Sequence, residues 1–125
     1  MNTDSIFVEV NGCRRSLAWL MENPSAATDV WVDNCPGLTS LPALPAATYV
    51  RIDNCPGLTT LPEMPAATDV RVYGCPGLTT LPALAGATYV WVYNCPGLTA
   101  LPALPAATIV RVFSCLGITG KSNER

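Results

Sequence analysis

The feature that most constrains this chain is a unit of twenty residues that recurs from residue 27 onward. Aligned on cysteine, the copies read ATDVWVDNCPGLTSLPALPA, ATYVRIDNCPGLTTLPEMPA, ATDVRVYGCPGLTTLPALAG, ATYVWVYNCPGLTALPALPA and the shortened ATIVRVFSCLGITG. Such a period is typical of a solenoid, in which each unit buries its apolar side chains against its neighbours. The sequence therefore predicts one elongated domain made of stacked turns.

Each unit divides into a strand, a turn and a return segment. The T-x-V-x-V portion alternates with period two and is rich in β-branched residues, which predicts a short strand with its valines inward. Cys-Pro-Gly-Leu suits a type II turn, with the glycine at the position of positive φ. The Leu-Pro-x-Leu-Pro run excludes a helix, because its prolines remove donors and fix φ, so we expect an extended or polyproline-like return.

The N-terminal segment resembles an older copy of the same unit. VEVNGC, Val8 to Cys13, shares the V-x-V-x-x-C core, although its cysteine precedes Cys35 by 22 residues rather than 20. On this interpretation all six cysteines occupy one repeat position. The longer spacing leaves room for a short helix over Arg14–Asn23, ended by Pro24. Its expected apolar contacts are Leu17, Leu20 and Met21.

The consensus V-x-V-x-N-C-x-x-L-T-x-L-P-x-L-P resembles a leucine-rich repeat. Its length and its return segment are similar to the short repeats of bacterial type III effectors of the YopM and IpaH kinds. Its cysteine is similar to the L-x-L-x-x-C-x-x-L pattern of plant resistance proteins, and alanine opens each repeat where leucine is usual. The resemblance covers roughly Val8 to Thr119. In the first full repeat it rests on Val30, Val32, Leu38, Leu41, Pro42, Leu44 and Pro45.

The resemblance implies an α/β fold, a right-handed leucine-rich-repeat solenoid. We expect a parallel sheet of about six short strands on the concave face, an extended or polyproline-like convex side and one short N-terminal helix. Residues 1–26 would form a diverged repeat with the capping helix, residues 27–119 the tandem repeats and residues 120–125 a polar tail. Domains of this kind generally bind a protein or peptide along the concave sheet, so such a partner is expected here.

The six cysteines are candidates for chemistry. Their even number is compatible with disulfides, and their thiols with a soft metal ion. However, equivalent residues in stacked repeats point the same way about 4.8 Å apart, whereas disulfides and zinc sites need converging side chains. The chain also has no histidine that could activate a thiol. We therefore expect a ladder of buried thiols in a protein that is not an enzyme, with no catalytic residue, no metal and no cofactor.

The outward strand positions, which flank the valines, carry most of the variation between repeats. They hold eight of the nine aromatic residues, all except Trp19. Tryptophan, tyrosine and arginine are typical of binding hot spots, so these positions predict a binding surface. The candidate residues are Trp31, Tyr49, Arg51, Arg71, Tyr73, Tyr89, Trp91, Tyr93, Arg111 and Phe113.

The predicted surface is asymmetric. Its first half is acidic, with Glu9, Asp29, Asp33, Asp53 and Asp69, and its second half is mostly aromatic. A large exposed apolar patch is rare on a soluble monomer unless it binds something. We expect Trp91 and Tyr93 to be anchors, with Arg71 or Arg111 pairing with a carboxylate of the partner.

The sequence is also compatible with other roles. Cation–π pairs of Trp31 with Arg51, and of Trp91 with Arg71 and Arg111, would stabilise the sheet without any partner. A homo-oligomer through the concave face or the terminal strand edge is a second alternative, and a structural or consensus-designed repeat protein a third. Ice or surface binding is a lower alternative, and an effector-type ubiquitin ligase is disfavoured because only KSNER follows the last repeat. The ice-binding alternative rests on a column of threonines, Thr39, Thr59, Thr79, Thr99 and Thr119.

Charge and hydropathy limit the classes of partner and the cellular locations that we expect. With a formal charge of −2 and one lysine, the chain offers no basic surface, so nucleic acid and anionic membrane are not expected as partners. The start, MNTDSIFVEVNG, does not have the basic and apolar regions of a secretory signal, and no apolar run approaches the roughly 18 residues of a spanning helix. We expect a cytoplasmic, reducing location, with delivery into a host cell if the protein is effector-like.

Overall fold

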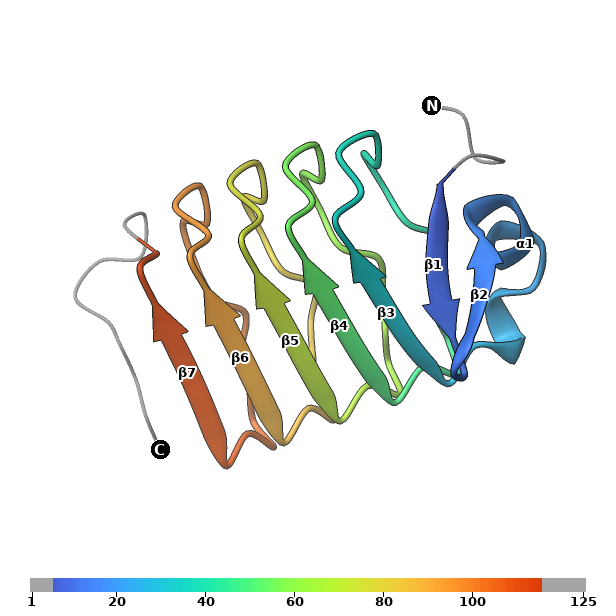
Figure 1. The fold of residues 1–125 in the computed structure, drawn as a ribbon. Coiled ribbons are helices and arrows are strands. Elements are labelled where there is room, and N and C mark those ends of the chain that lie inside the picture. Colours follow the sequence, from blue (N-terminus) through green and yellow to red (C-terminus); the bar gives the residue numbers. More distant parts are fainter. Residues whose placement is uncertain (1–5, 116–125) are drawn as a thin grey trace.

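A computed structural model describes residues 6–115, which form one seven-stranded sheet with a short α-helix beside its N-terminal edge (Figure 1). The strands lie in the order β2-β1-β3-β4-β5-β6-β7. Their bounds are β1 Phe7–Val10, β2 Cys13–Ser16, β3 Asp29–Asp33, β4 Tyr49–Asp53, β5 Asp69–Tyr73, β6 Tyr89–Tyr93 and β7 Ile109–Phe113. The helices are α1 Leu17–Glu22 and the 3₁₀ helix η1 Pro24–Ala26.

The five repeat strands, β3 to β7, pair in parallel and in register. Each residue lies opposite the residue twenty positions later, so that Val30 pairs with Val50 and Trp31 with Arg51. The threonine before each of the strands β4 to β7 extends the ladder, because its hydroxyl donates to the backbone carbonyl of the threonine in the preceding repeat at 3.0–3.2 Å. The predicted solenoid with a parallel sheet is confirmed.

The core lies between this sheet and the return segments. Both inward positions of every repeat strand are buried, and the leucine of each Cys-Pro-Gly-Leu turn is fully buried from Leu38 to Leu98. The alanines that open the repeats are buried from Ala27 to Ala87, which lets the return segment approach the sheet closely. Inward valines, leucines and alanines therefore form one continuous apolar layer along the solenoid axis.

The turn after each strand differs from the predicted type II geometry. Cys35 to Leu38 does form a turn, closed by the Leu38 N–H donating to the Cys35 carbonyl at 3.1 Å. The glycine inside it has no positive φ, and the left-handed residue is instead the one before the cysteine. That position holds Asn34, Asn54, Gly74, Asn94 and Ser114, with φ between 54° and 66°. Asparagine tolerates this conformation better than most residues do, which explains its recurrence.

The turn glycine is required by close packing of successive repeats. A Cβ atom built on Gly77 would lie 2.9 Å from the Pro56 carbonyl oxygen, and one on Gly97 would lie 2.6 Å from the Pro76 carbonyl oxygen. Such distances are far inside van der Waals contact, so any larger residue would push the turns apart. Gly37 in the first full repeat has no such neighbour, its nearest atom being Ile6 Cδ1 at 3.8 Å.

The N-terminal segment is not a copy of the repeat, and that prediction is wrong. Strand β1 runs antiparallel to both β2 and β3, and a two-residue turn at Asn11 and Gly12 joins β1 to β2. Both turn residues have positive φ, 53° and 82°, as a type I′ hairpin requires. The Asn11 side chain then accepts hydrogen bonds at 3.0 Å from the backbone N–H groups of Thr28 and Asp29, which orders the entry into β3.

The hairpin changes two further expectations. Cys13 lies on β2 and is exposed, so the thiol ladder has five members rather than six. The helix begins at Leu17 rather than Arg14, because Ser16 caps it by accepting a hydrogen bond from the Trp19 N–H at 3.1 Å. Leu17 and Leu20 are buried as predicted, whereas Met21 is half exposed.

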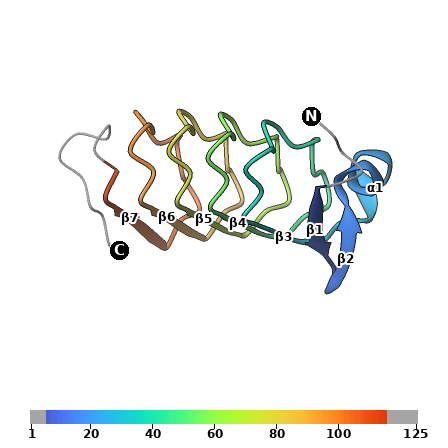
Figure 2. The same cartoon turned by 45° about the horizontal axis from the view of Figure 1, so that its top comes forward.

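The return segments cover only one side of the sheet, as the turned view shows (Figure 2). The other side is called the open face below, and it consists of the outward side chains of β3 to β7. None of the helices in the described residues is long and apolar enough to cross a bilayer. The predicted binding residues belong to the outward strand positions and therefore lie on the open face.

Candidate binding face

All ten candidate residues lie on the open face, in three columns set by the strand register. Each column takes the first, third or fifth residue of the five parallel strands. Nine of the ten side chains are half-buried by their neighbours in these columns, and Tyr93 is 44% exposed. The columns are residues 29, 49, 69, 89 and 109, residues 31, 51, 71, 91 and 111, and residues 33, 53, 73, 93 and 113.

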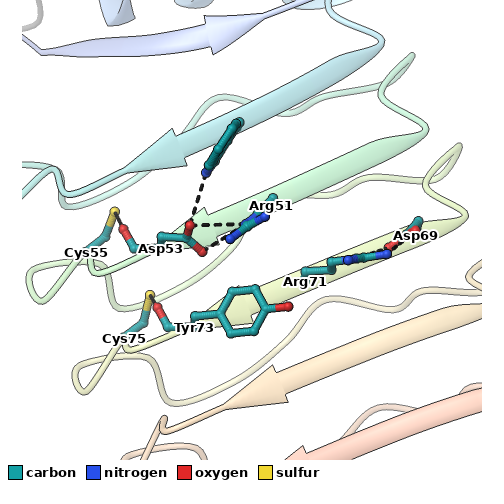
Figure 3. Close-up of polar contacts among 8 residues, drawn as sticks. Arg51, Asp53, Cys55, Asp69, Arg71, Tyr73 and Cys75 are labelled. Atoms are coloured by element: carbon teal, nitrogen blue, oxygen red, sulfur yellow. Dashed lines mark hydrogen bonds and ion pairs between the residues drawn. The ribbon is translucent and has the colours of Figure 1, made fainter.

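A polar cluster occupies the N-terminal end of this face (Figure 3). The Asp53 carboxylate accepts a hydrogen bond from Trp31 Nε1 at 3.1 Å and two from Arg51 Nε at 3.1 and 3.3 Å. The Arg51 guanidinium also lies over the Trp31 ring, 4.7 Å from its centroid. Asp53 is only 7% exposed, so its charge is neutralised inside the cluster rather than presented to a ligand.

A second ion pair lies in the middle of the face. Arg71 Nε donates to Asp69 Oδ1 at 3.0 Å, and its terminal nitrogen donates to the other carboxylate oxygen at 3.3 Å. The same guanidinium lies over the rings of Tyr89 at 4.8 Å and Trp91 at 5.7 Å. Arg71, one of the two arginines predicted to pair with a partner, therefore already has a carboxylate on its own strand.

Aromatic rings fill the C-terminal end of the face. Tyr73 lies 6.0 Å from Trp91 and 6.1 Å from Tyr93, and Tyr93 lies 5.4 Å from Phe113, measured between ring centroids. The pairs are tilted or edge-on, which is a favourable arrangement of ring quadrupoles. Burial raises the pKa of Tyr73, because the charged phenolate would lose solvation there.

The predicted cation–π pairs are confirmed in all three cases. Arg51 lies over Trp31, while Arg71 and Arg111 lie over Trp91, the last at 5.6 Å. Asp69 was expected only as an acidic residue of the face, and its role as the internal partner of Arg71 was missed. The signal that could have found this pair is the spacing, because residues two apart on a strand share one face.

The five cysteines of the repeats form a buried ladder beneath the turns. Each thiol donates to the backbone carbonyl two residues before it, for example from Cys55 to Asp53 at 3.4 Å. Burial raises the pKa of Cys35 and Cys115, and raises that of Cys55 to about 11. A hydrogen bond with Cys95, together with burial, raises the pKa of Cys75. The thiols pack as small apolar groups with a weak donor.

The described residues contain no cluster of cysteine and acidic side chains that is arranged to hold a metal ion.

The threonine column is exposed between Thr39 and Thr99. Two of its hydroxyls donate hydrogen bonds along the solenoid, from Thr79 to the Thr59 carbonyl at 3.5 Å and from Thr99 to the Thr79 carbonyl at 3.4 Å. Thr119 and the expected tail, residues 120–125, lie outside the described residues.

Comparisons with known proteins found no matching family model, no similar curated protein and no similar solved structure.

Proposed function

We propose that this chain is a non-enzymatic repeat scaffold that binds a protein or peptide through its open face. The observation that supports this most is the gathering of Tyr73, Tyr89, Trp91, Tyr93 and Phe113 on a side of the sheet that no return segment covers. Rigid aromatic side chains supply large contact area at low entropic cost, which is why they dominate hot spots. The repeats beneath are nearly invariant, so the scaffold stays constant while this surface varies.

The proposal includes a family and a location. Leucine-rich repeats of short length with a cysteine consensus are the family we propose, because Val30, Val32, Leu38 and Leu44, which carry the sequence resemblance, are buried here. A cytoplasmic, reducing compartment is proposed because the five repeat thiols are packed as separate donors to backbone carbonyls. Delivery into a host cell belongs to the same proposal if the chain acts as an effector.

The test is a capture experiment with the purified full chain against a Trp91→Ala/Tyr93→Ala variant. The matched control is Ser40→Ala/Glu63→Ala, which changes two exposed residues of the return side. A recovered protein is then produced alone and titrated, and we expect the aromatic variant to bind at least tenfold more weakly than the control. Recovery of the same proteins at the same affinity by both variants would contradict the proposal.

A purely structural role is the second candidate, and the internal contacts of the face favour it. All three arginines of the face lie over aromatic rings, and two of them also pair with aspartates. If these contacts serve stability alone, Trp91→Ala will lower the free energy of unfolding while the native chain captures nothing. Sedimentation over a range of concentrations separates this outcome from self-association through the open face, and thermal hysteresis checks the ice-binding alternative.

A further inference from the structure

The hairpin of β1 and β2 is attached to the first repeat through the side chain of Asn11. Its Oδ1 accepts hydrogen bonds from the backbone N–H groups of Thr28 and Asp29, both at 3.0 Å, and from the Thr28 hydroxyl at 2.9 Å. Its Nδ2 donates to the Ala26 carbonyl at 2.9 Å. These partners require a side chain that both donates and accepts, and they fix the orientation of the amide.

The backbone pairing of the hairpin with the repeats is short. Strand β1 pairs with β3 at two positions, Val10 with Val30 and Glu9 with Trp31, whereas β3 and β4 pair at five. Next to these two pairs, the Asn11 backbone N–H donates to the Asp29 carbonyl at 2.8 Å. The turn end of the hairpin therefore depends on Asn11 for most of its polar contacts with the solenoid.

Asn11 also belongs to an Asn-Gly dipeptide, which occurs once in the chain. In such a dipeptide the glycine nitrogen can attack the asparagine Cγ, because glycine has no Cβ that hinders the approach. A new C–N bond forms, the bond from Cγ to Nδ2 breaks, and the amide leaves as ammonia with the proton of the glycine N–H. Water then opens the resulting cyclic imide to aspartate or isoaspartate. Asn11 and Gly12 are both exposed, so water reaches this position.

The folded turn opposes this reaction. Attack requires the Asn11 side chain to turn its Cγ toward the Gly12 nitrogen and to release Nδ2. The four hydrogen bonds of the side chain hold the amide against residues 26–29 instead. We propose that Asn11 is a modification site that its contacts with the first repeat protect from deamidation, and that deamidation detaches the hairpin from β3.

The two products weaken the attachment to different degrees. Isoaspartate carries the backbone through the former side chain, which adds one carbon atom to the two-residue turn between Val10 and Cys13. Its carboxylate is attached to Cα and loses the geometry of the native amide. Aspartate keeps an acceptor for Thr28 and Asp29, but it places a second oxygen against the Ala26 carbonyl, where the native chain has a donor. Detachment would uncover the edge of β3, and an uncovered strand edge favours pairing with another chain.

The first experiment measures the rate of deamidation in the purified full chain. The chain is kept in neutral buffer with and without a denaturing concentration of urea, and peptide mapping by mass spectrometry quantifies aspartate and isoaspartate at residue 11. Because the reaction of the folded chain needs local opening, we expect it to be about tenfold or more slower than that of the unfolded chain.

Thr28→Val tests the contacts themselves, because it removes the hydroxyl that donates to Asn11 and leaves the backbone donor in place. We expect deamidation of the folded variant to be about threefold or more faster than in the native chain. The matched control is Thr68→Val, which removes the equivalent hydroxyl two repeats later, where it donates to the Thr48 carbonyl. Its rate should equal that of the native chain. Unfolding curves show that each variant is folded during the incubation.

The second experiment measures detachment by hydrogen exchange. The isoaspartate form is separated by chromatography, and we expect its Thr28 and Asp29 amides to exchange about tenfold or more faster than in the native chain. The amides of β5 should keep their protection, which shows that the solenoid stays folded. Asn11→Asp supplies the pure aspartate product and should give a smaller increase. Asn94→Asp, at an exposed asparagine with φ of 59° after β6, is the control and should leave both amides unchanged.

Three results would overturn the proposal. Equal rates of deamidation in the folded and the unfolded chain would show that the fold gives Asn11 no protection. Equal rates in folded Thr28→Val and Thr68→Val would show that the protection does not come from the contacts with the first repeat. Native exchange of the Thr28 and Asp29 amides in the isoaspartate form would show that the hairpin stays attached.

Discussion

The two ends of the open face have the same backbone and different surroundings. At the N-terminal end Trp31, Arg51 and Asp53 satisfy one another through hydrogen bonds, and the carboxylate is almost fully buried. At the C-terminal end Trp91 has the same register to Arg111, yet Phe113 replaces the acid and the indole N–H has no acceptor among the described residues. One end is therefore internally complete, and the other is the end that we expect to meet a partner.

The aromatic composition of a repeat surface therefore does not by itself locate a binding site. Trp31 and Trp91 are indistinguishable by residue type and by their position in the repeat. They differ in the residue 22 positions later, which is Asp53 for Trp31 and Phe113 for Trp91. Asp53 accepts a hydrogen bond from the Trp31 indole, whereas the Trp91 indole N–H has no acceptor among the described residues.

The largest effect is expected from a variant that disturbs the close packing of successive repeats. In Gly97→Ala the new Cβ would lie 2.6 Å from the Pro76 carbonyl oxygen, so the repeats carrying β5 and β6 have to separate. We expect a loss of about 3 kcal/mol in the free energy of unfolding, measured by urea denaturation. Gly37→Ala is the matched control, because its Cβ meets only Ile6 Cδ1 at 3.8 Å, and a similar loss there would contradict the packing explanation.

The next largest effect is expected from removal of the Asp53 carboxylate, which accepts the hydrogen bonds of the cluster at the N-terminal end of the open face. Asp53→Ala leaves both Trp31 Nε1 and Arg51 without their shared acceptor, which should cost about 2 kcal/mol of stability. The measurement is again the free energy of unfolding. Asp33→Ala changes an exposed residue of the same column and should cost less than about 0.5 kcal/mol. Equal losses in the two variants would mean that the cluster adds no stability.

A smaller effect on stability is expected when each of the two tryptophans is replaced by phenylalanine. Trp31→Phe removes a hydrogen-bonded N–H, whereas Trp91→Phe removes one that has no acceptor in the described residues. We expect Trp31→Phe to be the more destabilising of the two by about 1 kcal/mol. Thermal and urea unfolding of both variants provide the comparison. If Trp91→Phe were the more harmful, its indole N–H would have to be satisfied in solution.

The smallest effect concerns the thiol ladder that both ends share. Burial raises the pKa of Cys55 from its ordinary 9.0 to about 11, so the folded state favours the neutral thiol. This contribution is complete below about pH 9 and is lost as the pH rises toward 11, because the unfolded chain releases the proton first. Cys55→Ala should therefore lose less stability than the native chain between these pH values, and parallel curves would refute the assignment.

Much of the fold could be predicted from the sequence, because the residue pattern within each repeat indicates its backbone conformation. Alternating valines placed the strands, paired prolines excluded helices, and the constant period of twenty required parallel strands in register. The N-terminal hairpin was missed because VEVNGC matches the repeat core in letters. The dipeptide Asn11-Gly12 was the opposing signal, since both residues readily take the positive φ of a tight hairpin turn. That turn reverses the chain and places Cys13 outside the ladder.

For the binding face, the sequence determined which residues point outward, because strand side chains alternate strictly between the two faces. It could not determine which of them neutralise one another. Whether Asp53 binds Arg51 alone or also Trp31, and whether Arg71 takes Asp69 or a neighbouring acid, depends on side-chain rotamers and on distances of a few tenths of an ångström across adjacent strands.

The sequence alone thus determined a parallel solenoid with buried thiols and an aromatic outer face, because those properties follow from local periodicity repeated at a fixed interval. Only the tertiary structure decided that the first segment turns back as a hairpin, that the turn glycines serve close packing, and that Trp91 lacks the carboxylate that Trp31 has. The reason is that these properties arise from contacts between residues about twenty positions apart, and their energies depend on geometry that no single repeat contains.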